Sequence, residues 1–192
     1  EQCRYADWLA STGSSQDAIT VLAECIKNGP QASAPFIKLA TILEESQHRA
    51  QAEAVVLQGL QLVRDREPLV EWLTPRAVRD NSVPILLALY PSLMSLSHDS
   101  FDLLTPAGER LYQSGHEAQA ESLWRRKTAL PHSTDEAFNN LAVLEARRGH
   151  YDQAVAYLKQ ALTVNPGNRA ALTNQAVILR GGTQNAGVIQ PL

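Results

Sequence analysis

The sequence predicts an all-α protein, a solenoid of stacked antiparallel helix pairs. Three observations lead to this prediction. Similar segments recur every 34 residues, and five of them begin at Ser33, Glu67, Phe101, Asp135 and Arg169. Within a segment, apolar residues return at the three- and four-residue spacing of a helix that faces a core. Glycine or proline stands near the points where the helices should end.

The segment 135–168 shows this pattern most completely. A capping box at Ser133 and Glu136 should begin its first helix, and Gly149 can take the left-handed conformation that ends it. A second helix follows, and Pro166 ends it because proline removes a backbone donor. The faces that should pack together carry mostly apolar and small residues: Phe138, Leu141, Ala142 and Glu145 on the first helix, and Ala154, Leu158 and Ala161 on the second.

These residues resemble the tetratricopeptide repeat, a 34-residue helix-turn-helix unit with small and apolar residues at fixed positions. The one clear departure is Glu145, where the family pattern prefers tyrosine. The resemblance implies a right-handed superhelix. It also implies a non-catalytic scaffold or adaptor for protein–protein interaction, used in the assembly of a larger complex.

The same register divides the whole chain. The expected parts are 1–32, 33–66, a divergent unit at 67–100, 101–134, 135–168, a last helix at 169–180 and a tail at 181–192. The divergent unit should hold helices near 68–79 and 83–95, which Pro75 and Pro91 should end or kink. It is either a degenerate repeat that preserves the stack or a hinge that reshapes it. Gln47 stands where other units have glycine, so that turn must form without one.

Composition excludes several functions. The chain has 192 residues, 44% of them hydrophobic, and a formal net charge of −3, so nucleic acid and anionic membranes are poor partners. No apolar run approaches the ~20 residues of a membrane span. Because numbering opens at Glu1 rather than at methionine, we expect residues upstream, such as a signal or an anchor.

The two cysteines, Cys3 and Cys25, should lie at neighbouring ends of the first helix pair. A disulfide between them is geometrically feasible and would imply an oxidising compartment such as the periplasm. Two semi-buried thiols in a reducing compartment remain the alternative, so the sequence leaves the location open.

The resemblance also implies a concave groove, lined by the first helices of successive units, that holds a peptide or a partner protein. Carried over position by position, the groove residues are Lys38, Trp72, Glu109, Tyr112, Asn139, Asn140, Val143, Arg147, Asn174 and Val177. Asn140 and Asn174 occupy the same position one unit apart. An amide there offers a donor and an acceptor to a peptide backbone. The alternative is that both asparagines only solvate the helix surface.

No residue pattern indicates catalysis, a metal site or a cofactor. The histidines fall at expected turns, and the run Arg125-Arg126-Lys127 is interpreted as a solvated helix face.

The last helix, 169–180, is more apolar than an ideal capping helix. The tail, further sequence or a second copy should cover it, and the last case would mean self-association. The alternative function is a regulatory or periplasmic part of a larger enzyme or of a membrane-anchored bacterial secretion or pilus system.

Overall fold

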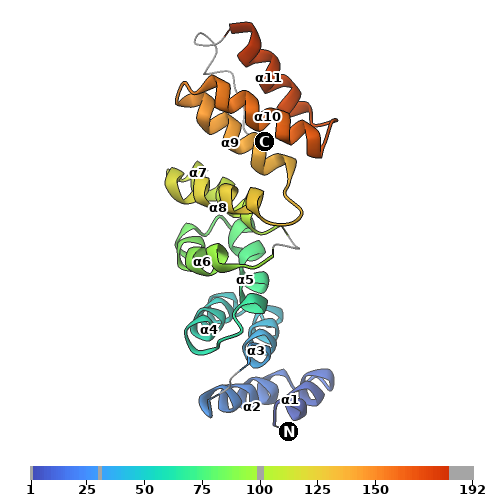
Figure 1. The fold of residues 1–192 in the computed structure, drawn as a ribbon. Coiled ribbons are helices and arrows are strands. Elements are labelled where there is room, and N and C mark those ends of the chain that lie inside the picture. The colour runs from blue at the N-terminus through green and yellow to red at the C-terminus, as the bar shows by residue number, and fades with distance from the viewer. Residues whose placement is uncertain (1, 30–31, 99–101, 182–192) are drawn as a thin grey trace. The chain divides into compact units, whose positions relative to one another are not determined.

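The computed structural model describes residues 2–29, 32–98 and 102–181. These residues form eleven α-helices and no strand, so the predicted all-α class is confirmed (Figure 1). In these ranges no helix has both the length and the apolar character needed to cross a membrane. The chain divides into two compact units, the N-terminal unit (residues 1–77) and the C-terminal unit (residues 78–192).

The N-terminal unit consists of consecutive helices that pack on one another. They are α1 (Gln2–Ser11), α2 (Ser15–Lys27), α3 (Ala34–Glu45), α4 (Arg49–Leu62) and most of α5 (Glu67–Arg79). Phe36 and Val56 are fully buried between α3 and α4. Gly59 of α4 keeps this packing close, because a Cβ there would lie 2.9 Å from both Phe36 and Leu69.

The turn between α3 and α4 forms without glycine, as the sequence requires. Gly115 and Gly149 end their helices with φ of +84° and +83°, and Gln47 takes φ +66° at the corresponding point. The backbone N–H of His48 then donates to the Leu43 carbonyl at 2.8 Å, which closes the turn. A non-glycine residue costs roughly 1–2 kcal/mol in this conformation.

The C-terminal unit contains α6 (Val83–Ser95), α7 (Leu104–Gln113), α8 (Glu117–Ala129), α9 (Asp135–Arg147), α10 (Tyr151–Val164) and α11 (Arg169–Gly181). Helix α9 is its centre, since it packs against α8 and α10 and also contacts α11. Small residues make this close packing feasible: Ala142 and Ala146 of α9 are buried together with Ala154 and Ala161 of α10.

The two prolines of the divergent segment lie inside helices rather than at their ends. Pro75 lies within α5, and Pro91 lies within α6. Both are exposed. Water can therefore reach backbone carbonyls that lack a helical donor because proline has no N–H. The expected helices near 68–79 and 83–95 correspond to α5 and α6.

The start of α9 differs from the predicted capping box. The N-cap is Thr134, whose Oγ1 accepts a hydrogen bond from the Ala137 N–H at 3.4 Å. The helix begins at Asp135, so Ser133 lies one residue too early to cap it.

The last helix presents an apolar face to solvent. Ala171 and Ile178 are buried, whereas Leu172 is 47% exposed and Leu179 is 70% exposed. What covers this face stays open, because residues 182–192 lie outside the described part of the chain.

At the other end of the chain, α1 and α2 pack together. The Cys3 side chain lies outside the described residues, so the disulfide to Cys25 stays a prediction.

Candidate partner-binding groove

In the N-terminal unit, the predicted groove residues Lys38 and Trp72 lie half-buried on α3 and α5. The Trp72 indole donates a hydrogen bond from Nε1 to Thr41 Oγ1 at 3.3 Å. Arg76 lies over the indole ring, with its guanidinium carbon 3.8 Å from the ring centroid. It also pairs with Glu44 at 2.8 Å. These contacts hold the partly exposed indole in one orientation between the two helices.

In the C-terminal unit, α7 and α9 bring Tyr112 and Arg147 together. Arg147 donates a hydrogen bond to the Tyr112 hydroxyl, and its guanidinium carbon lies 5.5 Å from the ring centroid. The Tyr112 ring also lies 5.7 Å from the ring of Trp124, which is buried in the core. Arg147 is exposed and Tyr112 is half-buried, so a partner can reach both.

Glu109 lies one helical turn before Tyr112, on the same side of α7. Its Oε1 accepts a hydrogen bond from Asn140 Nδ2 of α9 at 3.1 Å. Burial raises the pKa of the Glu109 carboxyl above 4.5, the bond from Asn140 opposes that rise, and the negative charge of Asp102 adds to it. The carboxylate is therefore held in surroundings that disfavour its charge.

The predicted pair of asparagines lies deeper than a groove surface. Asn140 is 1% exposed and Asn174 is 2% exposed. Asn174 donates from Nδ2 to Asn139 Oδ1 at 2.9 Å, so this pair joins α9 to α11. Val143 is also buried. The amides therefore form contacts between helices in this structure, and their role in binding a partner stays a prediction.

Val177 is half-buried against the core of the last helices. Among the predicted residues of the C-terminal unit, those that a partner can reach without rearrangement are Glu109, Tyr112, Arg147 and Val177. They lie on α7, α9 and α11, the first helices of successive pairs.

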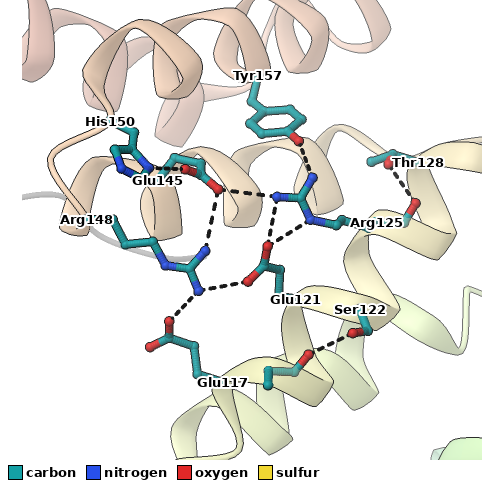
Figure 2. A network of polar contacts seen from close by, with 10 residues as sticks. Glu117, Glu121, Ser122, Arg125, Thr128, Glu145, Arg148, His150 and Tyr157 are labelled. Carbon is teal, nitrogen blue, oxygen red and sulfur yellow. Dashed lines mark hydrogen bonds and ion pairs between the residues drawn. The ribbon is translucent and has the colours of Figure 1, made fainter.

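A network of ion pairs joins α8, α9 and α10 (Figure 2). Arg148 pairs with Glu117 at 2.7 Å and with Glu121 at 2.8 Å. Arg125 pairs with the same Glu121 at 2.8 Å and with Glu145 at 3.3 Å. Its guanidinium also donates to the Tyr157 hydroxyl at 2.9 Å. Glu145 occupies the position where the family pattern prefers tyrosine. Its carboxylate oxygens accept bonds from several donors.

The same network explains the pKa shifts of its members. The hydrogen bond from Arg148 lowers the pKa of Glu121, although burial opposes this, and Arg125 contributes further. The bonds to Glu121 and Glu117 raise the pKa of Arg148. His150 Nδ1 lies 2.8 Å from Glu145 Oε2.

The sequence interpretation missed this network. Arg125-Arg126-Lys127 does not form a simple solvated face, because Arg126 donates to the Leu96 carbonyl at 2.6 Å and Lys127 is 1% exposed. The sequence contained one indication of this network: Glu145 is a carboxylate at a position where the helices of the pair should pack together. Among the described residues, no three His, Cys, Asp or Glu side chains are grouped as metal ligands would be.

Comparison with known proteins agrees with this arrangement. The family model of the tetratricopeptide repeat matches residues 135–168, which hold α9 and α10. Residues 135–168 are a tetratricopeptide repeat. The resemblance to this family is thereby confirmed for residues 135–168. Within this segment Glu145 departs from the family pattern, and its carboxylate bonds within the network of Figure 2.

Two further similarities extend beyond this tetratricopeptide repeat. The chain is similar to the crystal structure of MamA, with a TM-score of 0.51 and 16% identity over 84% of this chain and 94% of that one, which shows the fold alone. It is also 33% identical over 90 residues to the rhomboid protease GluP of Bacillus subtilis (strain 168). That match spans 47% of this chain and 18% of the length of GluP.

Proposed function

We propose that the chain is a non-catalytic scaffold that binds a peptide or a partner protein along the first helices of its repeats. The tetratricopeptide repeat at 135–168 and the succession of helix pairs support protein–protein interaction as its work. The observation that carries the proposal is the row of reachable Glu109, Tyr112 and Arg147 side chains on α7 and α9. Aromatic and arginine side chains of this kind supply much of the binding energy at interfaces.

In the N-terminal unit, Lys38 and Trp72 offer a second surface of the same kind. Trp72 is already held by Thr41 and Arg76, so little side-chain entropy is lost when a partner covers it. In the C-terminal unit, the buried Asn139, Asn140, Val143 and Asn174 support the side chains that a partner touches, and Val177 adds an apolar contact that a partner can reach.

Capture of partners from the native source, followed by mass spectrometry, tests the scaffold. Tyr112→Ala and Arg147→Ala should each weaken capture, because a partner loses a reachable aromatic or guanidinium contact. Lys159→Ala on α10 is the matched control, since Lys159 is exposed and lies outside this row. Unchanged capture by the Tyr112 and Arg147 variants, with their helix content intact, would remove this surface from the proposal.

The asparagines need a separate experiment because they also bond within the chain. Asn140→Ala and Asn174→Ala should lower stability as well as capture. Capture is therefore compared under conditions in which each variant is fully folded by circular dichroism. Full capture by both folded variants would limit these asparagines to a structural role.

The match to the rhomboid protease GluP favours a second candidate function, a regulatory part of a larger enzyme. A part of a membrane-anchored secretion or pilus system is the other form of this candidate, and it rests on the sequence interpretation alone. The sequence of the full gene product discriminates between the two. A catalytic domain in that product, whose activity changes when this segment is deleted, would support the second candidate. Thiol titration of the unfolded, unreduced protein tests Cys3–Cys25 and with it a periplasmic location.

A further inference from the structure

The space between α7 and α9 contains a carboxylate without a cation. Glu109 is half-buried, and Asn140 Nδ2 donates to its Oε1 at 3.1 Å. No basic side chain of the described residues forms an ion pair with Glu109. Removing a carboxylate from water without a cationic partner costs free energy, which a donor arriving from outside can recover.

The basic side chains Arg110 of α7 and Arg147 of α9 make their direct contacts elsewhere. Arg110, on the same helix, donates to Gln113 Oε1 at 3.0 Å. Arg147 donates to the Tyr112 hydroxyl and lies beside its ring. Neither neutralises Glu109 by direct contact, so the carboxylate is open to another positive group.

An independent observation also indicates that a hydrogen-bond donor from outside the chain fits at this place. Asn140 is 1% exposed, and its Oδ1 has no hydrogen-bond partner among the described residues. Buried amide oxygens are nearly always bonded, so one without a donor calls for an explanation. This oxygen belongs to the same amide group that contacts Glu109, so two acceptors lie side by side between the two helices.

We propose that Glu109 and Asn140 form a subsite for a basic side chain, lysine or arginine, of the bound partner polypeptide. The inference rests on the proposed scaffold function and specifies the chemistry of its partner. The incoming ammonium or guanidinium donates to the Glu109 carboxylate, and a further N–H meets the buried Asn140 Oδ1 once the side chains that cover this oxygen turn aside. The aromatic ring of Tyr112, one turn further along α7, borders the aliphatic stem of the basic residue.

The raised pKa of Glu109 agrees with this assignment. Burial disfavours its charged form, and the hydrogen bond from Asn140 and the more distant charge of Arg110 offset this only in part. A bound cation would complete that compensation and lower the pKa. A carboxylate with a purely structural role would already have its cationic or multiple N–H partners within the chain, as Glu121 does in the network of Figure 2.

The test uses the full chain and a library of short acetylated, amidated peptides of otherwise random sequence. One central position is fixed as lysine, arginine, neutral norleucine or glutamate. The wild-type chain should bind the lysine and arginine sets about 10-fold more tightly than the norleucine set, since a charge-assisted hydrogen bond contributes roughly that factor. Glu109→Gln should lose this preference while still binding the neutral set. Glu24→Gln, which changes an exposed carboxylate of α2, should keep it.

Glu109→Lys provides a second variant, whose preference should reverse toward the glutamate set. Amide NMR spectra verify that each variant is folded, and the side-chain NH₂ signals of Asn140 should shift when lysine peptides bind. If peptides bind without a preference for a basic residue, or if Glu109→Gln retains that preference, the proposed subsite is wrong. The proposed scaffold function is unaffected by either result. If the wild-type chain binds no set at all, peptide binding in this groove fails, and the subsite fails with it.

Discussion

At the scale of single residues, the approach of α7 to α8 depends on Gly108. A Cβ at this position would lie 2.5 Å from Nε1 of Trp124, a buried ring that donates a hydrogen bond to the Thr105 carbonyl at 3.2 Å. Gly108→Ala should therefore lower the free energy of unfolding by about 1–3 kcal/mol, the usual cost of overpacking a core. Urea denaturation followed by circular dichroism measures this change.

Gly167→Ala is the control for this substitution. Its Cβ would meet only Asn165 Oδ1 at 3.4 Å, so the unfolding free energy should stay the same or rise by ~0.4–1 kcal/mol. Equal effects of the two substitutions would contradict the packing described for Gly108.

Single residues also show how far sequence reasoning extends. Leu141 and Ala154 were expected on packing faces because helical spacing and the repeat register place them there, and both are fully buried. The depth of Asn139, Asn140 and Asn174 was not predicted, because register gives the side of a helix and not the distance to the neighbouring helices. The cap at Thr134 rather than Ser133 shows that helix ends are less predictable than helix faces.

At the scale of helices, the network of Figure 2 ties α8 to α9 and should make stability depend on pH. The folded-state pKa of Glu121 is lowered by Arg148, so its contribution is present above the ordinary value of 4.5 and is lost as pH falls through the lower folded value. Glu121→Gln should cost up to about 1 kcal/mol near pH 7 and much less near pH 3. Urea titrations of both proteins at the two pH values measure this.

Glu24→Gln serves as the comparison, because Glu24 is an exposed carboxylate of α2 in the N-terminal unit. Its cost should be close to zero at both pH values. If the difference between wild type and Glu121→Gln did not shrink in acid, Glu121 would not draw its stability from these ion pairs.

Helix α11 allows a prediction about self-association. Its exposed Leu172 and Leu179 form an apolar face that a second copy of the chain could cover. If a second copy covers it, the mass measured by light scattering should rise with concentration, and Leu179→Glu should keep the protein monomeric. Lys159→Glu on α10 should leave the mass unchanged. A monomeric wild-type chain at all concentrations would rule out this role for α11.

The helices themselves were largely predictable, and the ties between them were not. Periodicity, glycines and prolines define each pair, since these signals are local. The contacts from Arg125 to Glu145 and Tyr157 join residues that are 20 and 32 positions apart. No local pattern encodes them, and only the departure at Glu145 gave a hint.

At the scale of the whole molecule, the division into two units predicts that the C-terminal unit folds alone. Its helices pack mostly on their neighbours in the chain, as in other repeat proteins, where stability is the sum of local terms. A fragment of residues 82–192 should therefore remain helical by circular dichroism and unfold in one cooperative transition. Calorimetry and urea denaturation measure this.

A native core in that fragment should respond to substitutions as the full chain does. Leu141 is fully buried in α9, so Leu141→Ala should cost ~2–5 kcal/mol in both proteins, whereas Leu172→Ala, at an exposed position of α11, should cost far less. A fragment that is helical but melts without a transition, or in which both substitutions have equal effects, would lack this core. In that case the C-terminal unit would depend on the N-terminal unit for its fold, and the two could not be treated as separate binding surfaces.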